Sequence, residues 1–557
     1  QNLSFDRYQD FDLVNLANGI YIPEPGKPLL PVISTTVVIP ASARLTSVRV
    51  QPLGTVQIPG TFNILPGQVP VPFSEREKPD FNLPDPAVYR SDEPFPAQLL
   101  QNYSTGNAGG FRLVNLTICP FTYHPYSGRL FLHTRLQIDI SYQPDVQSAP
   151  IKTRFQTEQL LNSLKNLVLN PDDLSAFSPP IAEADQPEIN YLIITAPELA
   201  ASFQPYLEYK RARGLRTELR TTDWIERNYP GRDLPEKIRN HIIDYYQNRG
   251  LVYVLLAGDN RQVPSRHIRV DVGNEQGSIP ADLYYGDLDY SWDSNHNNLF
   301  GEMTDSVDLY ADVFVGRTSL ENPAQVENFI SKVIAFECTP QLNYIQRTLL
   351  PSGWLWRSLN YHGKFVNDSI AELTPAGWTD LKMENPPGAR VVADSFDHGF
   401  YIFDPAGHGN EAGVYDENGT PIYTTSFAGR QQNQNQYSII TSLACNPGNF
   451  EAEDCLAEVA LNCVNGGAIA VMMNSRYGWG TPPTMGPSEK LCVRFYDYLF
   501  NRSEYQLGPC HDCSREEYAS AALYSSLWRW CLTEFNLLGD PTLDLWTTPL
   551  PTCRNHS

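Results

Sequence analysis

The sequence predicts an α/β domain with a mostly parallel sheet flanked by helices, preceded by an all-β domain. Two observations lead to this fold class. Residues 1–180 contain short alternating stretches separated by Pro, Gly and Asn, as chains of β-strands do. From residue 188 onward, short apolar stretches alternate with longer amphipathic ones, which is typical of parallel strands joined by helices. A chain of 557 residues is long enough for two to four domains.

The N-terminal domain is expected to span residues 1–180, with a linker to about residue 187. Its predicted strands are residues 34–39, 46–51, 111–118 and 130–142. The stretch 58–96 is rich in Pro and acidic residues, which predicts a long surface loop or a covering arm. Leucines recur on one side of residues 155–169, so we expect a helix there.

The α/β domain is expected to span residues 188–550, with two subdomains divided near residue 340 as one option, and residues 551–557 form a tail. Its predicted strands are residues 191–195, 216–221, 251–257, 313–315, 347–350, 399–406, 437–442 and 468–473. The predicted helices are residues 197–213, 236–248 and 324–337, and residues 455–462 continue the alternating series without an assigned type.

Composition excludes some classes of function. The net charge of −22, from 41 basic and 63 acidic residues, disfavours a nucleic-acid partner. No window approaches the roughly 18–20 apolar residues that a transmembrane helix needs. The first residue is Gln1, as in a mature chain whose signal peptide has been removed, and ten cysteines fit an oxidising compartment. We therefore expect a protein that is secreted or held at the cell surface.

Two loops are candidates for a catalytic site because each follows a predicted strand. One contains Gly407-His408-Gly409, and the other contains Ala444-Cys445-Asn446. Open α/β sheets bind ligands at the carboxyl ends of their strands. A histidine there can take the proton of a cysteine thiol and later protonate the leaving amine of a peptide. The alternative is that Cys445 is inert packing or pairs with Cys455 or Cys463.

The backbone beside the two residues suits the same chemistry. Glycines around His408 would let a substrate backbone approach closely. The N–H groups of Gly409 and Cys445 could face a tetrahedral oxyanion, and loss of one such donor typically costs roughly 10²–10³ in rate.

The motifs of both domains resemble the gingipains, a family of cysteine peptidases with a caspase-like fold. In the α/β domain these are Ala406-Gly-His-Gly, Leu443-Ala-Cys-Asn-Pro-Gly-Asn-Phe, Gly467-Ala-Ile-Ala, Trp479 and Asn-Leu-Leu-Gly-Asp-Pro-Thr-Leu-Asp-Leu at residues 536–545. In the N-terminal domain, Gly-Lys-Pro-Leu-Leu-Pro-Val-Ile at residues 26–33 and Tyr-His-Pro-Tyr-Ser-Gly at residues 123–128 resemble the gingipain pro-domain.

The resemblance implies a role for each candidate residue. His408 would be the general base and acid, Cys445 the nucleophile, and the amides of Gly409 and Cys445 the oxyanion donors. Trp479 would wall the primary specificity pocket, and the pro-domain would cover the cleft of a zymogen. The partners would then be a polypeptide substrate and the chain's own pro-domain.

The chain departs from the arginine-specific members of the family. The resemblance would place one carboxylate behind the histidine and another in the specificity pocket, yet residues 338–367 contain no Asp or Glu. Recognition of a guanidinium usually needs an acidic partner, so we expect that arginine specificity is not retained. The pocket would take an apolar or even acidic side chain, or draw its acid from elsewhere. No Lys or Arg lies between Lys165 and Lys210, so the junction is cut at another residue or the pro-domain stays attached.

Two further motifs suggest ligands or cross-links. Oxygen-bearing side chains recur between residues 287 and 302, which predicts a structural calcium site; an Asx-rich solvated loop is the alternative. The candidate ligands are Asp287, Asp289, Asp293, Asn295, Asn297 and Glu302. Cys510-His-Asp-Cys513 has the spacing of a zinc knuckle, but without a second Cys/His pair nearby disulfide bonds are favoured.

Together these observations predict a secreted cysteine endopeptidase in zymogen form that uses a Cys–His dyad. The alternative is a weak or inactive peptidase scaffold that serves as a surface or filament subunit, which would make the chain a homo-oligomer. A processing peptidase of a bacterial secretion apparatus, also built on this fold, is not distinguished from a degradative enzyme.

Overall fold

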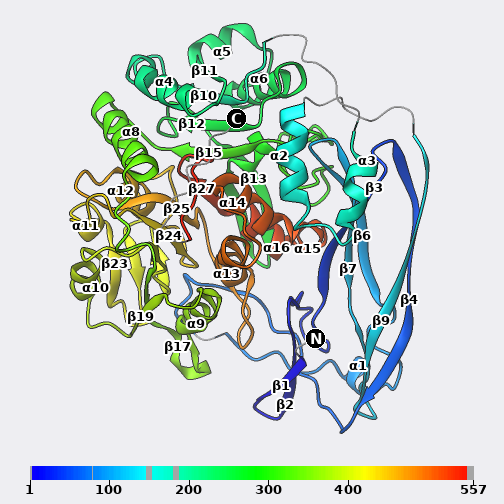
Figure 1. The fold of residues 1–557 in the computed structure, drawn as a ribbon. Helices are drawn as coiled ribbons and strands as arrows, with labels where there is room; N and C mark the ends of the chain where they lie inside the picture. Colours follow the sequence, from blue (N-terminus) through cyan, green and yellow to red (C-terminus); the bar gives the residue numbers. More distant parts are fainter. Residues whose placement is uncertain (1–2, 78, 146–153, 180–186, 548–557) are drawn as a thin grey trace.

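The computed structural model describes residues 3–77, 79–145, 154–179 and 187–547. A β-rich N-terminal domain lies beside a larger α/β domain (Figure 1). The N-terminal domain is built from antiparallel sheets with strand orders β3-β7-β6 and β4-β9-β8, and from the hairpin β1-β2. Their bounds are β1 Leu3–Tyr8, β2 Phe11–Leu16, β3 Ile33–Ile39, β4 Ala43–Ile58, β6 Leu100–Ala108, β7 Phe111–Ile118, β8 Phe121–His124 and β9 Arg129–Pro144.

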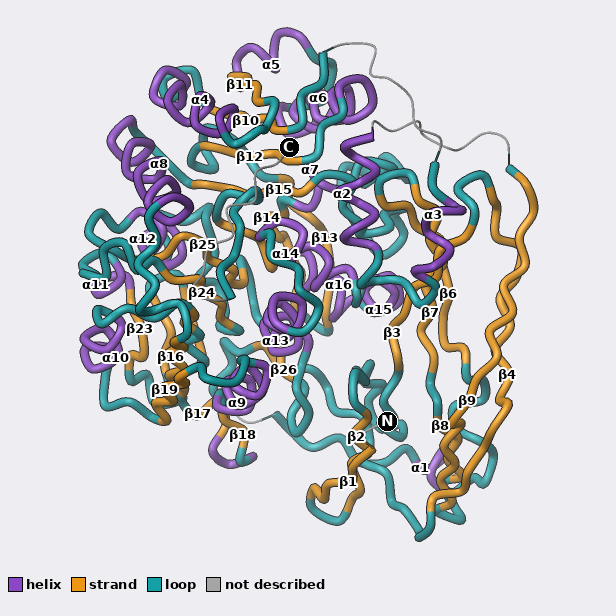
Figure 2. Tube along the Cα trace, viewed as in Figure 1, coloured by secondary structure: helices purple, strands orange, loops and turns teal. Residues whose placement is uncertain are grey.

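The four strands expected in this domain lie within β3, β4, β7 and β9. β4 and β9 are much longer than expected and form an extended ribbon at the edge of the molecule (Figure 2). The helix expected over residues 155–169 is α2, Arg154–Leu164. It ends early because the chain turns to pair with β3, where the N–H of Leu169 donates to the carbonyl of Thr36 at 2.8 Å. The short helices of the domain are α1 Pro86–Tyr89, η1 Pro171–Asp173 and α3 Leu174–Phe177.

The α/β domain is organised around one ten-stranded sheet of order β11-β10-β12-β15-β27-β25-β24-β20-β16-β19. Neighbouring strands are parallel except β25 and β27, which are antiparallel. The bounds are β10 Tyr191–Thr195, β11 Thr217–Thr221, β12 Tyr253–Ala257, β15 Phe314–Thr318, β16 Arg347–Ser352, β19 Thr379–Glu384, β20 Ile402–Phe403, β24 Ser438–Ser442, β25 Ala468–Asn474 and β27 Phe535–Leu538. The segments on either side of residue 340 therefore form two halves of one sheet, joined through β27.

Helices cover the sheet and have clear local determinants. In α6, the side chain of Asp233 caps the first turn by accepting from Glu236 N at 3.0 Å, and Gly250 ends the helix in the left-handed conformation. The remaining helices are η2 Ala200–Phe203, α4 Gln204–Ala212, α5 Thr222–Asn228, α6 Leu234–Arg249, α7 Leu283–Gly286, α8 Pro323–Cys338, η3 Arg357–Leu359, α9 Lys364–Leu373, α10 Ala389–Phe396, α11 Thr425–Ala428, α12 Leu456–Asn462, α13 Pro487–Phe500, α14 Leu507–Glu516, α15 Ala519–Tyr524 and α16 Ser526–Glu534.

Short hairpins outside the main sheet complete the domain. β13 Arg266–Val272 pairs with β14 Glu275–Ala281, and β17 Trp354–Trp356 pairs with β18 Tyr361–His362. β21 His408–Asn410, β22 Gly413–Tyr415 and β23 Pro421–Thr424 form a small antiparallel sheet. No helix in the described part of the chain is both long enough and apolar enough to cross a bilayer.

The two domains meet across a largely buried polar interface. The backbone N–H groups of Asn107 and Gly109 in the N-terminal domain donate to the carboxylates of Asp308 and Asp312, at 2.6 and 2.8 Å. Tyr310 donates to the side chain of Asn115 at 2.6 Å. Because buried polar groups are costly when they lose a partner, these contacts fix how the domains dock.

Close packing at the centre of the sheet gives a test of this architecture. A Cβ atom on Gly316 in β15 would lie 2.2 Å from the carbonyl oxygen of Gly539, so a side chain there would force β15 and the chain after β27 apart. We expect Gly316→Ala to lower the free energy of unfolding by about 1–3 kcal/mol or more. Val464→Ala, at a side chain that is 69% exposed, is the control and should change it by less than about 0.5 kcal/mol. Thermal unfolding measures both variants, and equal unfolding temperatures would contradict the strand order.

Candidate active site

His408 and Cys445 lie at the carboxyl ends of two adjacent parallel strands. β20 and β24 pair through Ile402 with Ile439 and Phe403 with Ile440, and the two candidate residues follow these strands. The loops touch, because a Cβ atom on Gly409 would lie 2.7 Å from the carbonyl oxygen of Cys445. Glycine at position 409 is what allows this approach.

The imidazole of His408 is buried between two backbone carbonyls. Its Nε2 lies 2.8 Å from the oxygen of Leu355, and its Nδ1 lies 2.5 Å from the oxygen of Phe73. The edge of the ring faces Trp356, with 5.8 Å between ring centroids. Leu355 lies in β17, so a backbone carbonyl stands where the sequence lacks an orienting carboxylate. An Nε2–H bond to Leu355 leaves Nδ1 as the basic nitrogen.

The protonation of His408 follows from these surroundings. Burial lowers its pKa below the ordinary histidine value, and the contacts with Phe73 and Leu355 only partly oppose this effect. Carbonyl oxygens accept but do not donate, so both contacts are hydrogen bonds only in the doubly protonated ring. The neutral ring can satisfy one of them.

Cys445 is a free and fully buried thiol. Its Sγ lies 3.5 Å from the carbonyl oxygen of Gly478. Burial raises the pKa of the thiol well above its usual value, and the charge of Glu534 adds to this effect. Hydrogen bonds with Gly478, with the hydroxyl of Ser74 and with the backbone of Phe73 act in the opposite direction but do not overcome it. In this state the sulfur is a neutral thiol.

A segment of the N-terminal domain, residues 71–75, covers both side chains; we call it the arm. Its first two residues form β5, Val71–Pro72, which pairs antiparallel with β26, Trp479–Gly480. The N–H of Phe73 donates to the oxygen of Gly478 at 2.7 Å. Trp356 Nε1 donates to the oxygen of Glu75 at 3.0 Å. The covering arm that the sequence placed within residues 58–96 is therefore confirmed.

Trp479 is buried beside the site. Its ring stands edge-on to Trp530, with 5.6 Å between centroids, and its backbone N–H donates to Ser488 Oγ at 2.9 Å. The pairing of Trp479 with the arm is by backbone. Its role as a pocket wall stays a prediction.

Sequence reasoning missed the two contacts that matter most at His408. The Leu355 carbonyl is a backbone group, and no residue type encodes it. Phe73 lies far from His408 in sequence, and only the Pro-rich composition around it indicated an arm.

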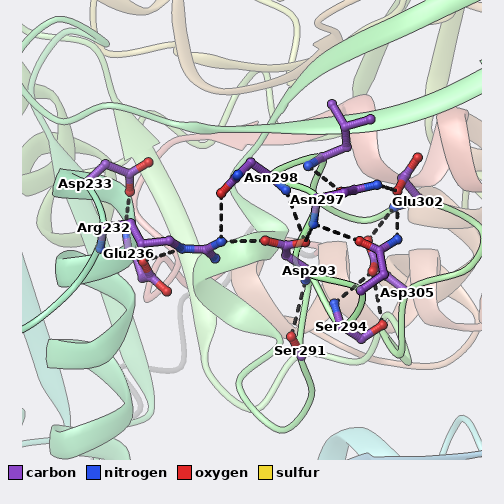
Figure 3. A network of polar contacts seen from close by, with 12 residues as sticks. Arg232, Asp233, Glu236, Ser291, Asp293, Ser294, Asn297, Asn298, Glu302 and Asp305 are labelled. Carbon is purple, nitrogen blue, oxygen red and sulfur yellow. Dashed lines mark hydrogen bonds and ion pairs between the residues drawn. The ribbon is translucent and has the colours of Figure 1, made fainter.

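The predicted calcium ligands have other partners in this structure. The Asp293 carboxylate forms an ion pair with Arg232 and accepts from Asn297 N at 2.9 Å (Figure 3). Asn295 and Asn297 direct their Nδ2 groups to Glu302, at 3.2 and 2.6 Å. These contacts are those of an Asx-rich loop closed on itself.

The other two candidate ligands, Asp287 and Asp289, differ from each other in burial. Asp287 is buried at the end of α7 and accepts from Leu309 N at 3.1 Å; burial raises the pKa of its carboxyl to about 7. The exposed Asp289 lies near enough for its charge to raise this pKa further. Among the described residues no group of three or more His, Cys, Asp or Glu side chains could hold a metal ion. The calcium site stays a prediction.

The cysteines do not support the expected disulfide bonds. All nine cysteines in the described part of the chain are free, Cys445 among them. Cys510 and Cys513 lie one turn apart on α14 and contact different carbonyl groups, those of Phe495 and Ser163. Cys445 is thus not paired with Cys455 or Cys463.

Comparisons with known proteins agree with this geometry. Gingipain R2 of Porphyromonas gingivalis is 22% identical over 486 residues, which cover 83% of this chain and 60% of that protein. Lys-gingipain W83 of the same organism is 21% identical over 84% of this chain and 26% of its own length. The chain therefore spans less than two thirds of the length of these relatives.

Solved structures show the same fold. The crystal structure of the Arg-specific cysteine proteinase gingipain R matches with a TM-score of 0.51 and 19% identity, over 66% of this chain and 80% of that chain. The complex of the Porphyromonas gingivalis RgpB pro- and mature domains matches equally well, at 0.51 and 19%, over 65% and 80%.

Family models account for most of the sequence. The C25 propeptide model matches residues 6–170, and the model of peptidase family C25 matches residues 184–546. With a pro-domain docked on a caspase-like sheet, and a histidine and a free cysteine at neighbouring strand ends, this chain belongs to peptidase family C25.

Proposed function

We propose that the chain is a secreted cysteine endopeptidase in zymogen form, in which His408 and Cys445 hydrolyse peptide bonds once the arm is displaced. The observation that supports this most directly is that both residues contact the same piece of backbone, at Phe73. Location outside the cell or at its surface is part of the proposal and rests on the likeness to the gingipains.

The proposed reaction has two stages, formation of a thioester on Cys445 and its hydrolysis. With the arm displaced, the Leu355 carbonyl holds His408 by its Nε2–H, and Nδ1 takes the proton of the Cys445 thiol. The sulfur attacks the substrate carbonyl carbon, and the amides of Gly409 and Cys445 donate to the resulting oxyanion. The intermediate expels the amine, which takes the proton from His408. Water then splits the thioester to a carboxylic acid and restores the thiol.

The same contacts account for latency in the full chain. The Phe73 carbonyl oxygen lies 2.5 Å from Nδ1 of His408, at the nitrogen that the thiol proton of Cys445 would have to reach. Cys445 is buried with a raised pKa, so the thiolate is scarce at neutral pH.

Specificity for arginine is not part of the proposal. Residues 338–367 contain no acid. Glu534 adds to the raised pKa of Cys445, but this carboxylate is fully buried and its Oε2 already accepts from Arg476 N at 3.1 Å and from Trp530 Nε1 at 3.3 Å.

Latency predicts the alkylation pattern of the full chain. Iodoacetamide at pH 8 should modify the exposed Cys338 at least a hundredfold faster than the buried Cys445, whose raised pKa keeps it protonated. Peptide mapping by mass spectrometry measures both sites in one sample. Proteolytic removal of the arm should raise the Cys445 rate to that of Cys338 or above. Equal rates in the intact chain would argue against a blocked nucleophile.

Activity should depend on the dyad. After limited proteolysis of the pro-domain, the chain should hydrolyse members of a diverse peptide library, and Cys445→Ala or His408→Ala should lower kcat/KM by at least about 10³. Cys338→Ala is the matched control and should leave kcat/KM unchanged. Retained hydrolysis in Cys445→Ala, or none in the unmodified chain, would refute the proposed function.

A further inference from the structure

The side chain of Phe73 occupies a pocket made by a tryptophan face and two glycines. The ring is fully buried and stacks on Trp356, with centroids 5.7 Å apart and an interplanar angle of 27°. A Cβ atom on Gly480 would lie 2.7 Å from the ring of Phe73, and one on Gly478 would lie 3.2 Å from it. Any larger residue at position 480 would therefore fill the space that the ring uses.

The backbone of Phe73 follows the path of a substrate past the two proposed catalytic groups, although its carbonyl oxygen lies against His408 and not at the proposed oxyanion amides. The arm runs antiparallel to β26, and Phe73 N–H donates to Gly478. The Phe73 carbonyl faces His408, and Cys445 contacts both the backbone of Phe73 and the hydroxyl of Ser74. The peptide bond between Phe73 and Ser74 thus lies across the two proposed catalytic groups, with Phe73 on its acyl side.

We propose that Trp356, Gly478 and Gly480 form the primary specificity pocket, and that this pocket takes a large aromatic side chain immediately before the scissile bond. This inference rests on the proposed function and names its substrate class: peptides with Phe or Tyr at that position. The Trp356 indole N–H is already bonded to the Glu75 carbonyl, and what the ring offers to Phe73 is its apolar face.

The chemistry of the walls separates aromatic from cationic substrates. An aromatic ring stacks on Trp356 and buries apolar surface, as Phe73 does. An arginine side chain would lose its water there, and the segment that carries Trp356 has no acid to replace it. Tyr361, whose ring packs against Trp356, donates its hydroxyl proton to Oε2 of the buried Glu489, and burial raises the pKa of this carboxyl to about 7.

The first experiment measures selectivity in the full chain after limited proteolysis, with the pro-domain fragments retained. Peptides that differ only before the scissile bond, with Phe, Tyr, Leu, Arg or Glu, should give a kcat/KM for Phe at least a hundredfold above that for Arg. Trp356→Ala should lower kcat/KM for the Phe peptide at least tenfold, and Trp356→Tyr should restore most of it. Trp354→Ala is the matched control on the same strand, because Trp354 packs on His362 instead. Preference for Arg, or no effect of Trp356→Ala, would overturn the proposal.

The second experiment separates the pocket from catalysis. In the nicked Cys445→Ala chain, calorimetry should show that a peptide ending in Phe binds at least thirtyfold more tightly than the same peptide ending in Arg. If the chain with Cys445 intact hydrolyses no peptide but this binding preference holds, the pocket assignment is supported and the proposed function is refuted. If the chain with Cys445 intact hydrolyses peptides but the peptides ending in Phe and in Arg bind equally tightly, the proposed function is supported and the pocket assignment is refuted.

The third experiment uses the intact chain. Phe73→Arg places a cation against the Trp356 face and should speed alkylation of Cys445 by iodoacetamide at least tenfold. Leu83→Arg, in the same domain at a side chain that is 76% exposed, is the control and should have no effect. An unchanged rate in Phe73→Arg would mean that the ring does not hold the arm in place, and would overturn the proposal.

Discussion

The contact between two loop backbones is the constraint on which this site depends. Gly409 can lie against Cys445 only because it has no side chain, and the contact brings together residues carried by β20 and β24. Each loop is held in turn by a strand buried in the sheet, so the positions of the imidazole and the sulfur are set by the hydrogen-bonded register of the sheet. The precision of the site is therefore a property of the scaffold.

A backbone carbonyl takes the place of a side-chain acid at His408. A carboxylate in that position would both orient the ring and stabilise the imidazolium, whereas the neutral Leu355 carbonyl orients the ring with less charge stabilisation. The direction of the His408 pKa agrees with this, since burial outweighs both carbonyl contacts. The orienting group also lies on the same short strand as Trp356, so one hairpin, β17–β18, contributes to the base and to the aromatic face beside it.

The sequence predicted those parts of the fold whose signals are local. β10, β12, β16, β24 and β25 are compact apolar runs, and the loops after β20 and β24 carry Gly-His-Gly and Ala-Cys-Asn. The edge strand β19 was missed because half-exposed polar residues conceal its period. Helices α13 to α16 were not identified, and α14 and α16 are buried on all sides, so neither shows an amphipathic stripe.

The candidate site divides along the same line. The sequence alone identified His408, Cys445 and the absence of acids in residues 338–367, because these features depend only on residue type. The sequence did not predict the contact of His408 with the Leu355 carbonyl or the pocket that holds the Phe73 ring. Both depend on contacts between segments that are far apart in the chain, which composition does not encode. The Asx-rich loop resembled a cation site because oxygen-bearing side chains alternate along it. In the structure these oxygens bind Arg232, which lies just before α6, and N–H groups of the loop itself.

The position of β27 has a consequence for biosynthesis. This strand comes from residues 535–538 yet lies in the middle of the sheet, between β15 and β25. A ribosome or an export channel releases the chain from its N-terminus, so the two halves of the sheet emerge long before the strand that joins them. Contacts that close over so many residues form slowly, and they leave apolar strand edges open in the meantime. The N-terminal domain emerges before both halves, and its contacts with Asp308 and Asp312 allow the first half to dock on it before β27 is made.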